Sequence, residues 1–137
     1  MPKITTKSVY ALAAVYFLYS HMHKLPMKIE SIAEGAHIPK NFLEQLLLLL
    51  KKSGILKSIR GARGGYTFAK DVQEILFLDI VKAVESECCN DVCKTHNPVL
   101  NLFWKDLGAC IQDFLQRPIS DLDTYIKKTQ EASMFII

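Results

Sequence analysis

Sulfur and imidazole groups gather in one short stretch of this 137-residue chain, where Cys88, Cys89 and Cys93 are followed by His96. Thiolates with an imidazole suit an iron–sulfur cluster, and exposed thiols alone can serve as a redox switch. Adjacent cysteines reach one iron only with distortion, so Cys88, Cys93 and His96 are the expected ligands, with Cys89 in reserve. Three further interpretations stay open: the protein senses a small molecule, the cysteines have no sensory role, and His96 is a surface or helix-capping residue.

A second candidate for chemistry is a glycine-rich turn between two short strands. Arg60 precedes the run Gly61-Ala62-Arg63-Gly64-Gly65, and segments at residues 55–60 and 66–69 flank that run, which predicts a β-hairpin. The narrow minor groove of DNA concentrates negative potential and attracts inserted arginine side chains. The sequence therefore predicts DNA contact by Arg60 and Arg63, the alternative being a solvated turn.

The elements ahead of the hairpin predict how it is positioned. A helix with a threonine N-cap is expected over residues 5–21, followed by a short second helix that Gly35 ends. Pro39 suits the first turn of a third helix, which Gly54 ends. Two helices joined by a turn and followed by a hairpin make a winged helix-turn-helix. The apolar residues at helical spacing are Val9, Leu12, Ala13, Tyr16, Phe17 and Tyr19 in the first helix, and Phe42, Leu43, Leu46, Leu47 and Leu50, expected to face inward, in the third.

Beyond the hairpin the pattern stays helical. It predicts a short helix to about residue 86, a loop over residues 87–97, a long helix over residues 98–116 and a last helix that Ser120 caps, with Leu122, Tyr125 and Ile126 inside. Cys110 falls on the apolar stripe of the long helix and is expected to be buried. That stripe is wide, which favours a subunit interface over the alternative of an intramolecular core helix.

These elements predict a mainly α fold with a small β-hairpin. The expected organisation is a winged helix-turn-helix DNA-binding domain over residues 1–86, a cysteine-rich sensor loop over residues 87–97, and a dimerisation helix with a C-terminal helix over residues 98–137. Half the residues are apolar, enough to bury a core. No stretch approaches the roughly 20 apolar residues of a membrane-spanning helix, and no secretion signal opens the chain, so we expect a cytoplasmic protein with no membrane partner.

Charge is distributed unevenly along the chain. Residues 1–75 carry 11 Lys and Arg against 5 Asp and Glu, whereas residues 76–137 carry 6 against 9. The net charge of +3 is therefore the sum of a basic N-terminal half and an acidic C-terminal half. This pattern is typical of a protein that meets phosphates with one end.

Three blocks of sequence are informative in combination. They are the opening Ile4-Thr5-Thr6-Lys7, the segment Ile38-Pro39-Lys40-Asn41-Phe42-Leu43-Glu44-Gln45, and the wing Gly54-Ile55-Leu56-Lys57-Ser58-Ile59-Arg60-Gly61 with Gly64-Gly65-Tyr66. Together they resemble the Rrf2 family of winged-helix transcription regulators, over roughly residues 3–126. The resemblance implies sequence-specific DNA binding, usually to repress transcription. It also implies a homodimer built on the helix over residues 98–116, with two recognition helices about one DNA turn apart on a palindromic operator.

The resemblance further implies recognition-helix contacts and a minor-groove contact from Arg60. Side-chain chemistry agrees in part, because Asn41 and Gln45 can pair with adenine and Glu44 can accept from cytosine. Lysines suit phosphates, which position a protein without specifying sequence. The full set of expected DNA-contact residues is Thr6, Lys7, Pro39, Lys40, Asn41, Phe42, Glu44, Gln45, Lys57, Arg60 and Arg63.

The cysteine loop departs from the family pattern. Many members hold an iron–sulfur cluster with three separated cysteines, and Cys93-Lys94-Thr95-His96 resembles the last part of that pattern, but the middle cysteine is displaced here. Some relatives add a ligand from the partner's first helix, and the matching positions, Val9 and Ala13, cannot coordinate metal. Redox, iron–sulfur or nitrosative signals at this loop would act by a rigid-body shift of the recognition helices.

Two other classes of protein are alternatives to a regulator. The four histidines are scattered, and no Ser-His-Asp, paired-carboxylate or phosphate-loop arrangement is visible, which argues against an enzyme. The remaining alternative is a winged-helix protein-interaction module without DNA binding or cofactor. Alanine at Arg60 and Arg63 discriminates the two, because it abolishes duplex binding only if the wing contacts DNA.

Overall fold

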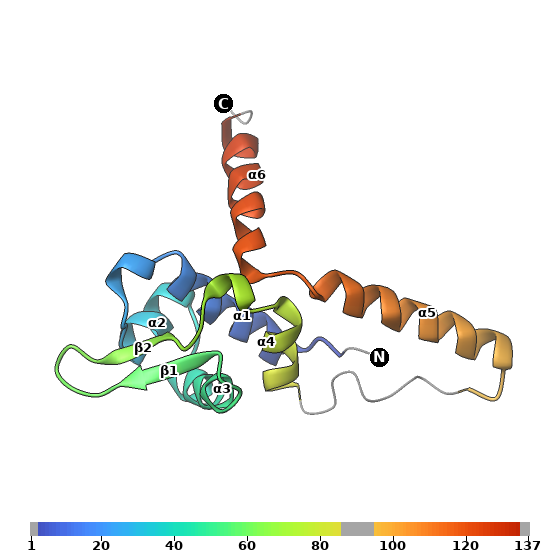
Figure 1. The fold of residues 1–137 in the computed structure, drawn as a ribbon, viewed down its shortest axis with the longest axis horizontal. Coiled ribbons are helices and arrows are strands. Elements are labelled where there is room, and N and C mark those ends of the chain that lie inside the picture. Colours follow the sequence, from blue (N-terminus) through green and yellow to red (C-terminus); the bar gives the residue numbers. More distant parts are fainter. Residues whose placement is uncertain (1–2, 86–94, 135–137) are drawn as a thin grey trace.

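The computed structural model describes residues 3–85 and 95–134, and it is mainly helical with one antiparallel hairpin (Figure 1). In chain order its elements are α1 (Thr6–Tyr19), a 3-10 turn (Met22–Lys24), α2 (Ile29–Ala36), α3 (Lys40–Lys52), β1 (Leu56–Ile59), β2 (Gly65–Phe68), a 3-10 turn (Val72–Glu74), α4 (Phe77–Val84), α5 (Pro98–Leu115), a 3-10 turn (Ile119–Asp121) and α6 (Leu122–Met134). The fold class predicted from the sequence is confirmed. No helix in the described ranges is long and apolar enough to cross a membrane.

The core lies where α1, α2, α3 and α4 pack together beside the hairpin. Its largest buried side chains are Val15, Leu18, Ile32, Leu43, Leu46, Leu47, Leu50, Ile55, Leu56, Ile75, Ile80 and Ile119. Burying one such aliphatic side chain contributes about 1.5–3 kcal/mol. This body holds α3 rigidly, because α3 buries one face against α1, α2 and α4 and leaves the other exposed.

The first helix buries a different face from the one its spacing suggested. Its buried residues are Ser8, Ala11, Ala14, Val15 and Leu18, whereas Val9 and Tyr16 are exposed. Because α1 is apolar on both faces, periodicity alone does not identify the core side. Its N-cap is Thr5, whose Oγ1 accepts from the Lys7 N–H at 3.2 Å.

The turn of the helix-turn-helix differs from the prediction in the residue that ends α2. His37 takes the left-handed conformation at φ 56°, and its N–H bonds to the Ala33 carbonyl. Gly35 lies inside α2, where a Cβ would fall 2.1 Å from the ring of Phe17. A glycine at this position therefore serves close packing of α2 on α1. Pro39 is also one position earlier than predicted, because it is the N-cap of α3.

The hairpin is fixed from two sides. β1 and β2 pair antiparallel from Leu56 opposite Phe68 to Ile59 opposite Gly65. The connector before α2 adds a bridge, in which the Met27 N–H donates to the Tyr66 carbonyl at 2.9 Å and the Tyr66 N–H donates back at 2.7 Å. The orientation of the hairpin relative to α2 is therefore set by backbone hydrogen bonds.

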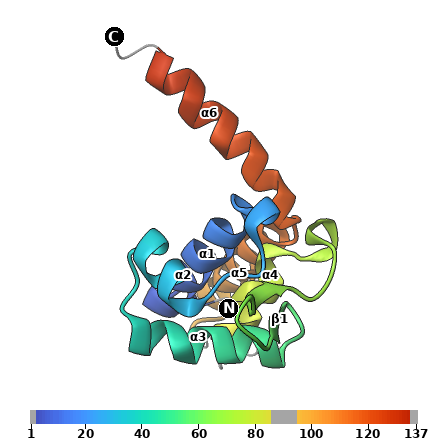
Figure 2. The same cartoon turned by 90° about the vertical axis from the view of Figure 1, so that its left-hand side faces the viewer.

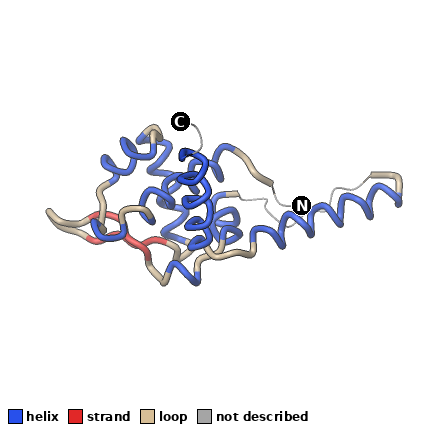
Figure 3. The backbone as a smooth tube through the Cα atoms, turned by 90° about the horizontal axis from the view of Figure 1, so that it is seen from above, coloured by secondary structure: helices blue, strands red, loops and turns tan. Residues whose placement is uncertain are grey.

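Helices α5 and α6 leave the body from one pinned junction. The Phe77 N–H donates to the Arg117 carbonyl at 2.9 Å, the Ile119 N–H donates to the Ile75 carbonyl at 2.8 Å, and the Ile119 side chain is buried. Figure 3 shows the strands and α5 at opposite ends of the molecule. Ser120 lies in the 3-10 turn before α6 and does not cap it, contrary to prediction.

Candidate nucleic-acid interface

Helix α3, the second helix of the helix-turn-helix, presents a polar face at its N-terminal half. Lys40, Asn41, Glu44 and Gln45 are all exposed, and positions i, i+1, i+4 and i+5 share one side of a helix. The opposite side is buried through Leu43, Leu46, Leu47 and Leu50. The amide and carboxylate groups are therefore held on a rigid element and directed away from the core (Figure 2 shows α3 along the lower edge, with α6 rising at the top).

The first residue of α3 takes part in an exposed ion pair. Lys40 Nζ lies 3.0 Å from Glu30 Oε1, with the two side chains 51% and 64% exposed. A hydrogen bond from its own backbone N–H, and then the Lys40 ammonium, lower the pKa of Glu30, while the hydrogen bond to Glu30 raises the pKa of Lys40. Exposed pairs of this kind contribute little to stability, so Lys40 can exchange this partner for a phosphate.

Phe42 differs from its neighbours on α3. It is half-buried, and its ring meets the ring of Tyr10 edge to face with centroids 5.4 Å apart. Phe42 therefore packs between α3 and α1, and it faces inward as the sequence predicted. Its base contact, implied by family resemblance, stays a prediction.

The wing carries the expected basic residues on its surface. Lys57, Arg60 and Arg63 are exposed, and none has an ion pair with a residue in the described ranges. The turn is tight, since a Cβ on Gly64 would lie 2.0 Å from the Ile59 carbonyl oxygen. The hairpin thus presents its arginines at a fixed, projecting tip (Figure 1).

The start of α1 is held by a carboxylate that the sequence analysis did not select. Glu85, 6% exposed, accepts on Oε1 from the Thr5 N–H at 3.0 Å, the Thr5 hydroxyl at 2.5 Å and the Ser8 hydroxyl at 2.8 Å. Thr6 and Lys7, two expected DNA contacts, are exposed directly beside this network. The sequence signal that could have identified this contact was an acid directly after the apolar α4, together with the hydroxyl residues Thr5 and Ser8 at the start of α1.

Most of the predicted cysteine loop lies outside the described residues. Cys88, Cys89 and Cys93 lie outside the described residues, whereas His96 is described and exposed. Beyond it, Asn97 caps α5 by accepting from the Val99 N–H at 2.9 Å. Among residues 3–85 and 95–134, no group of three or more His, Cys, Asp or Glu could hold a metal ion.

Helix α5 places its apolar residues outside the core of its own chain. Gly108 is its one buried residue, so an intramolecular core helix is excluded. Cys110 is exposed, which corrects the prediction that it is buried. The large exposed apolar residues of α5 are Val99, Leu100, Leu102, Phe103, Leu107 and Phe114.

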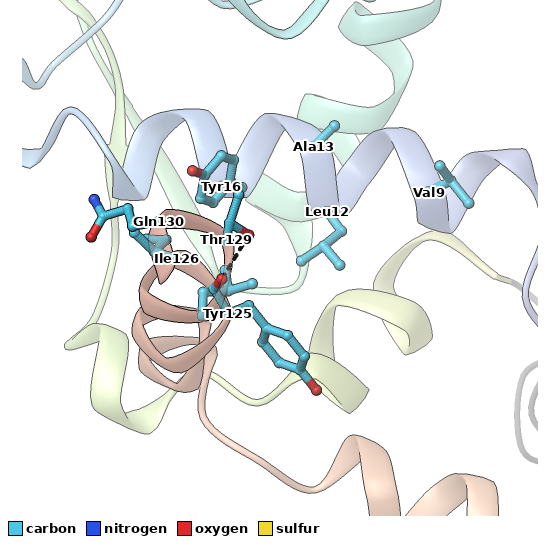
Figure 4. Close-up of a pocket in the computed structure, with 9 residues that line it drawn as sticks. Val9, Leu12, Ala13, Tyr16, Tyr125, Ile126, Thr129 and Gln130 are labelled. Carbon is cyan, nitrogen blue, oxygen red and sulfur yellow. Dashed lines mark hydrogen bonds between the residues drawn. The ribbon is translucent and has the colours of Figure 1, made fainter. Parts of the chain in front are cut away.

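An apolar groove of about 590 Å³ lies between α1 and α6. Figure 4 shows Leu12 and Tyr16 on the part of α1 next to Tyr125 and Ile126 of α6, whereas Val9 lies farther along α1. The residues that α1 contributes to the groove belong to the apolar set from whose spacing this helix was predicted. The prediction that Tyr125 lies inside was wrong, because it is exposed. Leu122 is half-buried and packs against the core, and Ile126 is half-buried.

A helix-turn-helix with an exposed polar recognition face, followed directly by a basic hairpin, defines the winged-helix fold of DNA-binding proteins. The sequence profile of the Rrf2 family, described as iron-dependent transcriptional regulator, matches residues 4–119. The HTH-type transcriptional regulator CymR of Bacillus subtilis is 31% identical over 137 residues, covering 98% of this chain and 99% of CymR. The chain therefore belongs to the Rrf2 family, and it is a DNA-binding transcriptional regulator.

Solved structures agree with this assignment. The structure of B. subtilis CymR, described as the global cysteine regulator of that organism, matches with a TM-score of 0.80 at 30% identity, covering 91% of this chain and 98% of that one. T. potens IscR matches with a TM-score of 0.77 at 31% identity, covering 95% of this chain and 90% of that one. The predicted family is confirmed.

Proposed function

We propose that this protein acts as a homodimer that binds a palindromic DNA operator in a sequence-specific way and represses transcription. The observation that carries the proposal is the exposed face of α3, where Asn41, Glu44 and Gln45 stand on a helix whose other side is buried. The two amides can read adenine bidentately and the carboxylate can accept from cytosine N4 in the major groove.

The remaining contacts follow from charge and position. Arg60 and Arg63 at the wing suit an adjacent narrow minor groove. Thr6, Lys7, Lys40 and Lys57 are exposed and suit backbone phosphates, and Pro39 brings the start of α3 to the same surface.

Homodimerisation is supported by the apolar residues that α5 leaves exposed. A helix of 18 residues that buries one glycine in its own chain exposes an apolar surface of the kind subunit interfaces cover. A two-fold axis through two copies of α5 would set the recognition helices about one DNA turn apart, which matches a palindrome.

Selection from a library of random duplexes tests sequence-specific binding. The wild-type chain should enrich a palindromic motif. Gln45→Ala should then relax discrimination at one base position in each half-site, by about 1–3 kcal/mol. Arg60→Ala with Arg63→Ala should weaken all duplexes and lower their salt dependence. The protein would instead be a protein-interaction module if it enriches no sequence and if the wing substitutions leave its weak DNA affinity unchanged.

Sedimentation analysis tests the dimer. Phe103→Glu places a charge in the exposed apolar surface of α5 and should convert the dimer to a monomer. Lys105→Glu is the matched control, because it adds the same side chain about 200° further round the helix and should leave the dimer intact. A wild-type monomer at micromolar concentration contradicts the proposal.

The proposed signal enters through the loop before α5. Its thiols and His96 have the donor chemistry of an iron–sulfur site, and His96 is exposed with no hydrogen bond to another described residue. A cluster held by Cys88, Cys93 and His96, with Cys89 in reserve, would supply a redox-sensitive or nitric-oxide-sensitive group there. Thiol oxidation of the same cysteines is the alternative.

Anaerobic purification followed by an absorption spectrum and iron and sulfide assays separates these two signals. Visible bands with stoichiometric iron and sulfide support the cluster, whereas a colourless, iron-free protein that binds DNA supports the thiol switch. Cys93→Ala should uncouple operator affinity from redox conditions in either case. An unchanged redox response in that variant removes the loop from the mechanism.

A further inference from the structure

An open basic groove of about 540 Å³ lies between the connector before α2 and the tip of the wing. The connector contributes Lys24 and Lys28, α2 contributes Ser31, and the wing contributes Arg63 and Gly64. In Figure 1 this is the left end of the molecule, opposite α5. Neither lysine belongs to the contacts that the sequence analysis selected.

The groove is positively charged without local compensation. Lys24, Lys28 and Arg63 are exposed, and none has an ion pair with a residue in the described ranges. Glu30, the nearby acid of α2, forms an ion pair with Lys40 at 3.0 Å. The charge of Lys28 lowers the pKa of Glu30 less than Lys40 does. Three cations therefore face one groove, with the Ser31 hydroxyl as a further donor.

The backbone fixes the width of the groove. Two hydrogen bonds between Met27 and Tyr66, of 2.9 and 2.7 Å, join the connector to β2. At Gly65 the two chains are so close that a Cβ would lie 2.4 Å from the Met27 carbonyl oxygen. Lys28 follows Met27 and Arg63 lies two residues before Gly65, so both cations are attached to backbone that cannot move apart independently.

We propose that this groove binds a phosphate group, namely a backbone phosphate of the DNA flanking the half-site that α3 reads. The inference rests on the proposed sequence-specific DNA binding. Arg63 is shared between the groove and the wing tip, so a wing placed in the minor groove brings the adjacent sugar–phosphate strand to Lys24 and Lys28. Free inorganic phosphate has the same chemistry, and the experiment distinguishes the two sources.

The test uses full-length protein carrying Lys24→Gln with Lys28→Gln, and the selected operator duplex next to an unrelated duplex. Each protomer of the dimer loses one phosphate contact, so the slope of log affinity against log salt should fall by about 1.8, and binding should weaken by roughly 50-fold near 0.1 M salt. Both duplexes should lose the same factor, so sequence discrimination is unchanged. Lys127→Gln with Lys128→Gln removes the same charge from α6 and should leave the slope unaltered.

Neutral methylphosphonate linkages locate the contact on the DNA. Neutralising one phosphate outside the half-site should weaken the wild type but have no further effect on the Lys24→Gln, Lys28→Gln variant. Additive losses, or equal losses in the α6 control, overturn the proposal. Calorimetric titration of DNA-free protein with inorganic phosphate at constant ionic strength completes the test. Binding of free phosphate to the wild type, with an unchanged DNA salt slope in the variant, would reassign the groove to a free anion.

Failure of the groove and failure of the proposed function look different. If the wild type selects a sequence and the variant matches it at every salt concentration, only the groove assignment is wrong. If the wild type selects no sequence at all, sequence-specific binding is wrong and the groove proposal is rejected with it.

Discussion

Glu85 should be the polar residue on which the stability of the DNA-binding body depends most. It is 6% exposed, and its Oε1 receives three hydrogen bonds from Thr5 and Ser8, which join the end of α4 to the first turn of α1. Ser8 is itself 4% exposed. Glu85→Ala therefore leaves a buried hydroxyl without its acceptor and releases the N-cap segment.

The expected cost can be worked from these contacts. Hydrogen bonds to a charged group contribute about 1.5–3 kcal/mol, and a buried donor left unsatisfied costs about 1–3 kcal/mol. Because these contributions overlap, Glu85→Ala should lower the free energy of unfolding by about 2–4 kcal/mol, and Glu85→Gln, which keeps an acceptor, by about 1–2 kcal/mol. Urea and thermal unfolding measure both. Glu74→Ala is the control, since an exposed acid should change stability by less than about 0.5 kcal/mol.

The pH dependence has a definite sign. Burial raises the pKa of Glu85, but hydrogen bonds from Thr5 and Ser8 outweigh burial and hold that pKa below its ordinary value of 4.5. The carboxylate therefore stabilises the fold at pH above the unfolded-state pKa, and the contribution is lost as pH falls through the lower folded-state pKa. Glu85→Gln should remove this acid-side loss.

A double-mutant cycle between Glu85→Ala and Ser8→Ala tests the cause. The two substitutions should couple by more than about 0.5 kcal/mol, because they share one hydrogen bond. Additive effects, or a Glu85→Ala variant as stable as the wild type, would refute the reasoning.

The remaining predictions concern the positions of the hairpin and of α6. Gly65→Ala should cost more than Gly61→Ala in thermal unfolding: both have positive φ, at 147° and 115°, which strains alanine by about 1–3 kcal/mol, but only Gly65 would also clash with the Met27 carbonyl. Equal losses would contradict that close approach. Tyr19→Phe should cost about 1 kcal/mol, because the Tyr19 hydroxyl donates to Asp123 of α6 at 2.8 Å. Burial, and then that hydrogen bond, raise the pKa of Tyr19 to about 12, so its contribution is complete below about pH 10 and lost as pH rises toward 12. Between about pH 10 and 12, the melting temperature should depend less on pH in Tyr19→Phe than in the wild type. The same pH dependence in both proteins would contradict this.

The helix-turn-helix and the wing could be predicted because their signals are local and mutually consistent. Leu43, Leu46, Leu47 and Leu50 lie at helical spacing on one side of α3, and lysine, amide and carboxylate residues occupy the other side of its N-terminal half, so the buried side could be predicted although Leu48 is exposed. The glycines of the wing likewise allow only a tight turn between short strands.

Other features depend on tertiary contacts that no local signal carries. Gly35 has the residue type of a helix stop, but it lies within α2, where a Cβ would clash with the Phe17 ring unless that ring shifted, and His37 takes the left-handed conformation in its place. Cys110 lies on an apolar stripe, but that stripe faces away from the core of its own chain, so a prediction of burial from pattern failed. An apolar stripe predicts that a surface is covered, without identifying which chain covers it.

The same reasoning explains why α1 misled the assignment of a core face. One side of α1 contributes Ala11, Ala14, Val15 and Leu18 to the body, and the other side lines the groove with α6. Both sides are apolar because this helix meets two surroundings. Its N-terminus is also fixed by Glu85, immediately before the cysteine loop, and exposes Thr6 and Lys7. The first helix thus contacts the core, the helix α6 and the end of α4, so any change in the position of Glu85 is transmitted to the exposed first turn of α1 through the hydrogen bonds to Thr5 and Ser8.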